Sequence, residues 1–255
     1  MRLPCNLGVS ISNQMNGFVS LRQDQYIRAM KKIYLLVLSY LLVNTFPLQA
    51  QGLTGVFLNE DKPVKELILL IDGYASYIRY STEEYQGTWG GPFELKDERL
   101  LVQVEYDDQN KNKIGLQNND INWKDGNLSL NGHQFKRLAN KSQQLDGLWR
   151  ITGRKQNEQL VEIPKGDRKT IKLLIDGYFQ WIAINPAKKE FHGTGGGLYS
   201  FSAGNYTENI LFFSRDNSRV GAKLEFQGST DGKIWQHQGL SSKGDPIYEI
   251  WTREQ

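Results

Sequence analysis

The six residues Leu-Leu-Ile-Asp-Gly-Tyr occur twice in this chain, at 69–74 and at 173–178. Asp-Gly between an apolar run and an aromatic run is typical of a tight hairpin, because glycine readily adopts the positive φ that a type I′ turn needs. The alternative is that Asp72 and Asp176 are catalytic carboxylates or metal ligands, but Asp-Gly turns are common and we favour the turn. The phrase therefore predicts a strand, a turn and a second strand, once in each half of the chain.

The similarity between the two halves extends beyond this phrase. Two further pairs of segments match: LTGVF (53–57) with LDGLW (145–149), and GTWGGPF (87–93) with GTGGGLY (193–199). Two copies are too few for a stacked solenoid, which needs at least about three repeats. We therefore expect two domains, at 51–138 and 145–255, joined by a polar linker at 139–144.

Each of these domains contains a series of short segments rich in aromatic and β-branched residues, separated by turn-forming Gly, Asn and Asp. Few segments have helical periodicity. This pattern predicts an all-β protein made of two tandem small antiparallel up-and-down barrels of about eight strands each. A pair of β-sandwiches is the alternative.

The segment 30–50 has the parts of a secretory signal peptide. Lys31 and Lys32 precede an apolar run at 33–46, and a cleavage region ends at Ala50. The apolar run is shorter than the ~18 residues expected of a spanning helix. We therefore expect cleavage near Ala50, export to the periplasm or the extracellular medium, and no stable membrane span afterwards. Residues 1–29 precede the signal, and we expect them to be a non-native leader.

The basic residues of the chain are concentrated at its start. Five of the 31 Lys and Arg residues lie within 1–50, but only one of the 28 Asp and Glu residues does, which leaves 26 basic against 27 acidic residues. Such a balance gives no electrostatic reason to expect nucleic acid as a partner. The single cysteine, Cys5, also lies before residue 51, so we expect neither a disulfide nor a thiol nucleophile in the two domains.

Gly147-Leu-Trp149 opens the second domain, and Arg253 lies in its last predicted strand. This pattern resembles the Gly-x-Trp signature of lipocalins and their calycin relatives, in which the tryptophan packs against an arginine from near the last strand. The second domain also resembles a lipocalin-like domain of uncharacterised secreted bacterial proteins, through GTGGGLYSF (193–201), NYTENILFF (205–213) and KGDPIYEIWTR (243–253). The resemblance implies a secreted barrel closed by Gly147, Trp149 and Arg253, and it identifies no ligand.

The first domain is a weaker copy of this pattern. It has Phe57 where the second domain has the tryptophan, and Lys136 or Arg137 is the candidate partner near its last strand. We therefore interpret the first domain as a degenerate barrel that stabilises or docks the second.

Alternating residues of two predicted strands suggest a binding pocket in the second domain. Trp235 and His237 share one strand face, and Glu208 and Phe212 share another, because alternate side chains of a strand point the same way. If both faces point into the barrel, Glu208, His237 and Tyr199 form a polar floor beneath an aromatic pocket. The predicted ligand-binding set is therefore Tyr199, Glu208, Phe212, Trp235 and His237.

A buried carboxylate at Glu208 would need a partner for its charge. Arg253 and Lys243 are the candidates near the last strand. Because buried charges usually require pairing, an ion pair that supports the structure is the preferred interpretation of Glu208 over a catalytic role.

Recognised catalytic and cofactor motifs are missing from the sequence. There is no Gly-x-Ser-x-Gly elbow, and one buried Glu without a second carboxylate is a poor indication of glycosidase chemistry. The three histidines, His133, His192 and His237, lack metal-binding spacing. The glycine run at 192–197 leads into a predicted strand, which indicates a bend or bulge and not a phosphate loop. We therefore expect no catalytic residue, no metal and no cofactor.

Together these patterns predict a secreted, non-enzymatic lipocalin-like protein that binds a small apolar or amphipathic ligand in its second barrel. One alternative is an interaction module with filled barrels, which binds a protein or a glycan at the cell surface through aromatic side chains such as Tyr77, Trp89 and Trp181. The other is a barrel enzyme that uses Glu208 and His237.

Overall fold

The protein was studied as a computed structural model that describes residues 53–61, 63–241 and 243–254. The expected leader at 1–29, the expected signal peptide at 30–50 and Cys5 lie outside the described residues. Within the described part of the chain, no helix is long and apolar enough to cross a membrane.

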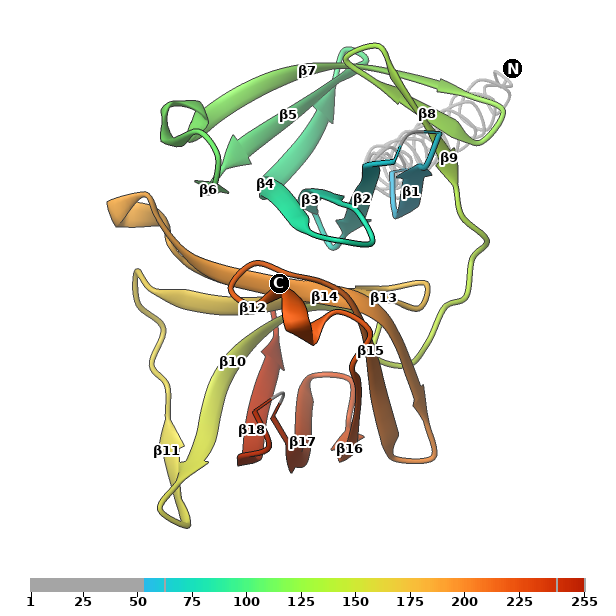
Figure 1. The fold of residues 1–255 in the computed structure, drawn as a ribbon. Helices are drawn as coiled ribbons and strands as arrows, with labels where there is room; N and C mark the ends of the chain where they lie inside the picture. The colour runs from blue at the N-terminus through green and yellow to red at the C-terminus, as the bar shows by residue number, and fades with distance from the viewer. Residues whose placement is uncertain (1–52, 62, 242, 255) are drawn as a thin grey trace, which may run out of the picture. The chain divides into compact units, whose positions relative to one another are not determined.

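The first half of the described chain forms one closed antiparallel barrel (Figure 1). Eight strands pair in chain order, β1 closes the ring by pairing with β9, and the short β6 adds a pairing with β4. A 3-10 turn, η1 (Lys111–Lys113), precedes β7. The strands are β1 (Gly55–Asn59), β2 (Lys65–Ile71), β3 (Tyr74–Tyr80), β4 (Tyr85–Lys96), β5 (Arg99–Val104), β6 (Tyr106–Asp107), β7 (Gly115–Lys124), β8 (Asn127–Leu130) and β9 (His133–Arg137).

The second half repeats this architecture, with β10 closing the ring against β18 and β11 as the additional strand on β10. The strands are β10 (Gly147–Gln156), β11 (Gln159–Glu162), β12 (Lys169–Ile175), β13 (Tyr178–Asn185), β14 (Glu190–Ser202), β15 (Asn205–Phe213), β16 (Lys223–Thr230), β17 (Ile234–Leu240) and β18 (Pro246–Arg253), with the 3-10 turns η2 (Pro186–Lys188) and η3 (Asn217–Arg219). The prediction of an all-β protein with two eight-stranded antiparallel barrels is confirmed, and the sandwich alternative is wrong.

The repeated phrase forms the hairpins that it predicts. Asp72 and Gly73 have φ of 49° and 72°, and Asp176 and Gly177 have φ of 51° and 82°. Two successive positive φ values define the type I′ turn, whose twist matches that of the flanking strands. Ile71 pairs with Tyr74 across the first turn.

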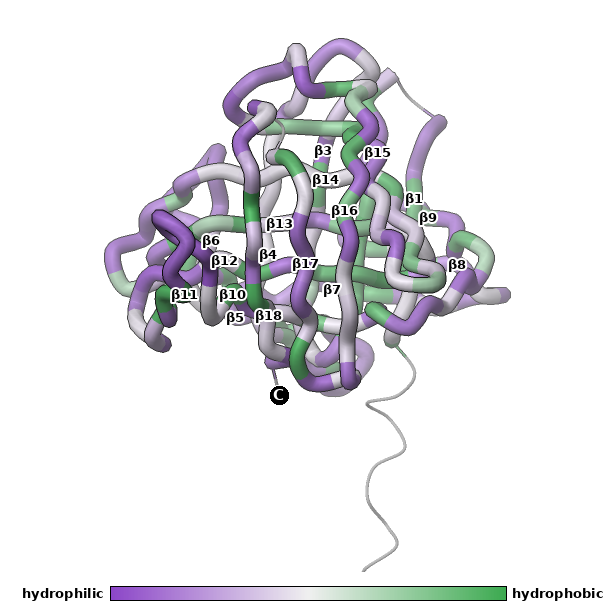
Figure 2. The backbone as a smooth tube through the Cα atoms, turned by 90° about the horizontal axis from the view of Figure 1, so that it is seen from below, coloured by the Kyte–Doolittle hydropathy of each residue, from purple (hydrophilic) through white to green (hydrophobic). Residues whose placement is uncertain are grey.

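The apolar run before each turn is continuous because both of its faces are buried. On β2, Ile68 and Leu70 point into the first barrel, whereas Leu67 and Leu69 point outward into a separate core. A half-exposed strand would show alternation, as β16 does at Lys223, Leu224, Glu225 and Phe226, and the hydropathy of each strand can be followed along the tube in Figure 2. The first interior core consists of Leu53, Phe57, Ile68, Leu70, Ala75, Leu100, Val102, Val104, Leu128, Leu130 and Phe135.

The outward core is shared by the two barrels. It contains Leu67, Leu69, Ile71 and Ile78 from the first barrel, and Ile171, Leu173, Ile175 and Ile182 from the matching positions of the second. The second barrel has its own interior core, made of Leu145, Trp149, Leu174, Phe179, Tyr199, Tyr206, Ile210, Phe226, Trp235 and Trp251. The described part of the chain therefore has three cores, one inside each barrel and one shared core between them.

Equivalent residues of the repeat meet each other beside the shared core. Ser76 and Gln180 are 104 positions apart, as the two phrases are, and the Ser76 hydroxyl donates to Gln180 Oε1 at 2.6 Å. The Gln180 amide donates to the hydroxyls of Thr88 (3.2 Å) and Thr194 (3.0 Å), which are also equivalent in the matched segments. Contacts between identical patches characterise a two-fold, isologous interface.

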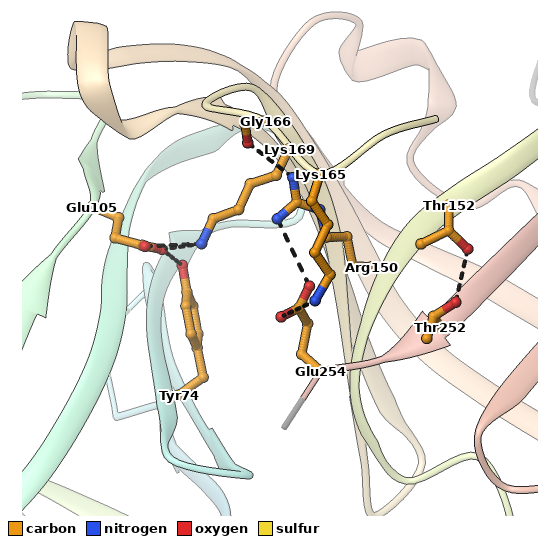
Figure 3. Close-up of polar contacts among 9 residues, drawn as sticks. All are labelled: Tyr74, Glu105, Arg150, Thr152, Lys165, Gly166, Lys169, Thr252 and Glu254. Carbon is orange, nitrogen blue, oxygen red and sulfur yellow. Dashed lines mark hydrogen bonds and ion pairs between the residues drawn. The ribbon is translucent and has the colours of Figure 1, made fainter. Parts of the chain in front are cut away.

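A charged contact also joins the two barrels. Lys169 Nζ of β12 lies 2.8 Å from Glu105, which follows β5, and Glu105 also accepts a hydrogen bond from the Tyr74 hydroxyl at 2.8 Å (Figure 3). Burial and the adjacent Glu105 carboxylate raise the pKa of Tyr74. Tyr74 therefore remains a neutral hydrogen-bond donor to Glu105.

Candidate functional site

A cavity of about 680 Å³ lies in the first barrel, not in the barrel where the sequence predicted a pocket. Its walls come from β2, β3, β4, β5, β7, β8 and β9 together with the segment 107–113. A volume of this size falls in the range of about 300–1,000 Å³ that is usual for small-molecule sites. Gly55, Phe57 and Arg137, which correspond to the barrel-closing Gly147, Trp149 and Arg253 of the second barrel, define the closed end of the first barrel. They do not line the cavity.

One wall of the cavity is aromatic. Tyr77 on β3 and Trp89 on β4 are cross-strand partners, and their rings stack with centroids 5.5 Å apart and planes 27° apart. Phe135 on β9 meets Tyr77 edge-on at 6.4 Å. Tyr77 and Trp89 are partly exposed, whereas Phe135 is buried. The wall thus presents ring surface on rigid strands.

A buried carboxylate lies beside this wall. Glu66 on β2 is 7% exposed, and its side chain accepts hydrogen bonds from the Tyr77 hydroxyl at 2.6 Å and from the Asn59 amide at 3.2 Å. His133 Nδ1 lies 3.4 Å from the same carboxylate. Burial and the bond to Glu66 raise the pKa of Tyr77, so its hydroxyl stays protonated and holds the ring in place.

The rim of the cavity is held by hydrogen bonds to two aspartates. Asp107 accepts from the backbone N–H groups of Gln109 (3.0 Å) and Asn110 (2.8 Å). Asp108 accepts from the backbone N–H of Thr88 at 2.9 Å and from the Tyr85 hydroxyl. These bonds connect the segment after β6 to β4, so the rim is ordered by the protein itself.

The matched segments explain why a cavity opens in the first barrel. At the position of Trp89 the second barrel has Gly195, where the ring of Phe213 packs on Trp181 with centroids 5.5 Å apart. A Cβ at Gly195 would meet both of these side chains at 2.7 Å. Closer to the closed end, Ala75 of the first barrel is matched by the buried ring of Phe179. The second barrel therefore fills space that the first barrel leaves to its cavity.

Side chains occupy the centre of the second barrel. Lys172 Nζ lies 2.9 Å from Glu208 Oε1, and both side chains are 6% exposed. Four rings surround the ammonium group, with centroids 4.9 to 5.8 Å from Nζ: Trp251, Trp235, Tyr206 and Phe179. The partner of Glu208 is thus Lys172, and the prediction of Arg253 or Lys243 is wrong. Lys172 lies on β12, far along the chain from the last strand, although closure of the barrel brings its ammonium group to the Trp251 ring of that strand.

His237 lies in the same interior and is 2% exposed. Its ring stacks on Trp235 with centroids 4.6 Å apart, and its Nε2 accepts from the Trp251 indole at 3.1 Å. Glu249 Oε2 also lies 3.1 Å from Nε2. Burial lowers the pKa of His237 despite this carboxylate. Among the described residues, His237 Nδ1 and Trp235 Nε1 have no hydrogen-bond partner.

The structure separates one residue from the predicted ligand set. Tyr199, Glu208, Trp235 and His237 all lie in or against the second interior core, where the Tyr199 hydroxyl donates to Asp146. Phe212 instead belongs to the shared core and packs on Tyr80, with centroids 5.2 Å apart. A β-bulge is the reason, because Gly196 pairs with Phe212 while Gly197 pairs with Ile210, which shifts the alternation of β15 by one residue.

The closed ends of the two barrels have the same construction. The Arg253 guanidinium lies 5.3 Å from the Trp149 ring and donates to the carbonyl of Asp146. A side chain at Gly147 would collide with Arg253. In the first barrel, Arg137 is the equivalent arginine, and it lies 5.9 Å from Phe57 and 5.8 Å from Trp123, a ring supplied by β7.

The glycine run at 192–197 is part of strand β14, and a bulge at His192 against β13 confirms the predicted bend or bulge in this run. The bulge that moves Phe212 lies on β15, at Leu211, opposite Gly196 and Gly197. The described residues contain no group of three or more His, Cys, Asp or Glu side chains that could hold a metal ion.

No protein-family model matches this chain, and no curated protein matches its sequence. The two barrels are compatible with a lipocalin-like fold. The geometry of the cavity is therefore the basis on which a function can be assigned. Sequence reasoning placed Tyr77 and Trp89 among possible surface aromatics and missed Glu66. The sequence contains one signal for this cavity, which is the replacement of Trp89 by Gly195 between the matched segments of the two barrels.

Proposed function

We propose that this protein is a binding protein that holds a small amphipathic molecule in the mouth of its first barrel. The observation that carries the proposal is the cavity of about 680 Å³, which combines an aromatic wall with polar groups already held by hydrogen bonds. Ring and aliphatic surface of the ligand would be buried against Trp89, and the polar groups would set its orientation.

The proposal moves the binding site from the second barrel to the first. The second barrel then serves as a stable partner, because the Lys172–Glu208 pair and its surrounding rings occupy the centre where a ligand would lie. No reaction is assigned, since Glu208 and His237 are each engaged by a charged neighbour in that core. Binding after export from the cell remains part of the proposal.

The proposal is tested by mapping where small molecules contact the purified protein. We expect a library of organic fragments, screened by two-dimensional NMR, to shift the indole N–H signal of Trp89 and the side-chain amide signals of the cavity. Trp89→Ala should remove most of these responses. Trp123→Ala should keep them, because Trp123 lies at the closed end of the same barrel and does not line the cavity.

Fragment shifts confined to the second barrel would contradict the proposal. A library without any response in the first barrel would do the same.

A further inference from the structure

The polar lining of the first-barrel cavity is dominated by amides. Seven of its twenty lining residues are Asn or Gln, compared with three acidic residues and two Lys or Arg. A side-chain amide offers both a donor and an acceptor. Neighbouring hydroxyl groups of a ligand need both, because each hydroxyl donates one hydrogen bond and accepts others. The small imbalance of charge gives no reason to expect a strongly ionic ligand.

Several of these amides are held in place by the protein. The Asn119 amide donates to the carbonyl of Leu100 at 3.2 Å, and its oxygen accepts from the Asn131 amide at 2.9 Å. Asn131 in turn accepts from the backbone N–H of Asp120 at 3.0 Å, and the Gln117 amide donates to the carbonyl of Lys113 at 2.9 Å. Groups fixed in this way lose little conformational entropy when a ligand binds, which favours affinity for a weakly apolar molecule.

The aromatic wall complements these amides. A sugar ring carries aliphatic C–H groups on its faces and hydroxyl groups around its edge. Such a ring can lie against Trp89, whose indole also stacks on the neighbouring Tyr77, while its edge meets the amides of β7 and of the rim.

A lipid ligand fits this lining poorly. A fatty chain that displaced water from the cavity would leave amide donors and acceptors without hydrogen-bond partners, at a cost for each group. A ligand with hydroxyl groups can instead make the hydrogen bonds to these amides that the displaced water made.

From this combination we propose that the ligand of the first barrel is a neutral saccharide, packed with one ring face on Trp89 and bound through its hydroxyl groups to the amide side chains. This inference rests on the proposed binding at the cavity and adds the chemical class of the ligand.

The test compares sugars that differ in charge on the same ring. Saturation-transfer NMR and calorimetry on the purified protein would use glucose, N-acetylglucosamine, maltose and cellobiose, with glucosamine as the cationic comparison, glucuronate as the anionic one and laurate as the lipid. We expect binding of one or more neutral sugars, with saturation transferred to ring C–H protons. Trp89→Ala should weaken this binding by about tenfold or more, and Trp89→Phe by less, because part of the ring contact is kept.

The other outcomes separate the inference from the proposed function. Binding of laurate or of a charged sugar at Trp89, without binding of any neutral sugar, would overturn the saccharide class and leave the cavity as a binding site. Neutral-sugar binding that Trp89→Ala leaves unchanged would overturn the packing on Trp89. If no compound of the panel binds and fragments also fail at this barrel, both proposals fall.

Discussion

Lys172 and Ile68 occupy equivalent positions in the two copies of the repeat, and both point into a barrel. In the first barrel the position is filled by an aliphatic side chain. In the second barrel it carries a charge that is stabilised by Glu208 at 2.9 Å and by four surrounding rings. A buried ion pair is tolerated in such a place only while both partners are present, because each charge has lost its water.

We therefore expect Lys172→Met to lower the free energy of unfolding by about 3–5 kcal/mol, since it leaves the Glu208 carboxylate buried without a counter-charge. The double variant Lys172→Met, Glu208→Gln should recover part of this loss. Urea unfolding followed by circular dichroism measures both.

The control is Lys223→Met, which removes an exposed ion pair with Glu225 at 2.7 Å. An exposed pair contributes about 0–1 kcal/mol, so this variant should be close to wild type. Equal effects of Lys172→Met and Lys223→Met would show that the interior pair does not support the barrel.

His237 makes stability depend on pH. Burial lowers its pKa below the ordinary value of 6.5, with the charge of Lys172 acting in the same direction and Glu249 opposing it. The unfolded chain therefore takes up a proton at a higher pH than the folded protein does. Stability is fully present above about pH 6.5 and is lost as the pH falls below it, by at most about 1.4 kcal/mol per pH unit for one proton.

Unfolding free energies measured between pH 7.5 and 5 test this expectation in wild type and in His237→Gln, which should lose most of the slope. Glu249 affects stability in a more acidic pH range. Its pKa lies below the ordinary 4.5, so its contribution to the free energy of unfolding is lost only as the pH falls below that value. Gln238→Ala, on the exposed face of the same strand, should keep the wild-type slope. A slope that His237→Gln leaves intact would assign the dependence to other groups.

At the scale of elements, β14 and β15 determine which residues each core receives. The glycines of β14 let the strand lie close to its neighbours, since a Cβ at Gly196 would collide with the carbonyl oxygen of Phe179 and the ring of Phe212. The bulge beside Gly196 then turns Phe212 outward to the shared core.

We expect Gly196→Ala to destabilise the protein by about 1–3 kcal/mol, because backbone and core must move to admit one methyl group. Gly166→Ala is the matched control, since Gly166 is exposed and nothing lies within 4 Å of an added Cβ there. It should change stability by less than about 0.5 kcal/mol. Thermal unfolding of the two variants measures the difference in stability. Equal melting temperatures would contradict the close packing of Gly196 against Phe179 and Phe212.

At the scale of the whole molecule, the shared core couples the two barrels. Leu69 and Leu173 are equivalent residues of the repeat, both fully buried in this core. Because side chains from both barrels build it, we expect the described chain to unfold in one cooperative transition.

Leu69→Ala should therefore cost about 2–5 kcal/mol and lower the protection of both barrels. Hydrogen exchange of β8 in the first barrel and β17 in the second measures this. Loss of protection in β8 with unchanged β17 would show that the barrels unfold independently.

The fold followed from local patterns, and the site did not. The two Asp-Gly turns, the strand count and the barrel architecture could be predicted because turn chemistry and β-propensity act over a few residues. The side of β15 on which Phe212 points could not be predicted, because a one-residue bulge in this strand reverses its alternation and the residues of β15 do not mark it. The ion-pair partner of Glu208 could not be predicted either, because only closure of the barrel brings Lys172 next to Glu208.

The sequence by itself determined a duplicated β protein with a hairpin at each LLIDGY and with a Gly-x-Trp opening in its second half. Only the tertiary structure decided which barrel has room for a ligand. The reason is that interior volume depends on the sum of side chains from many strands, so Trp89 faces a cavity while Phe213 covers Gly195 at the matching place.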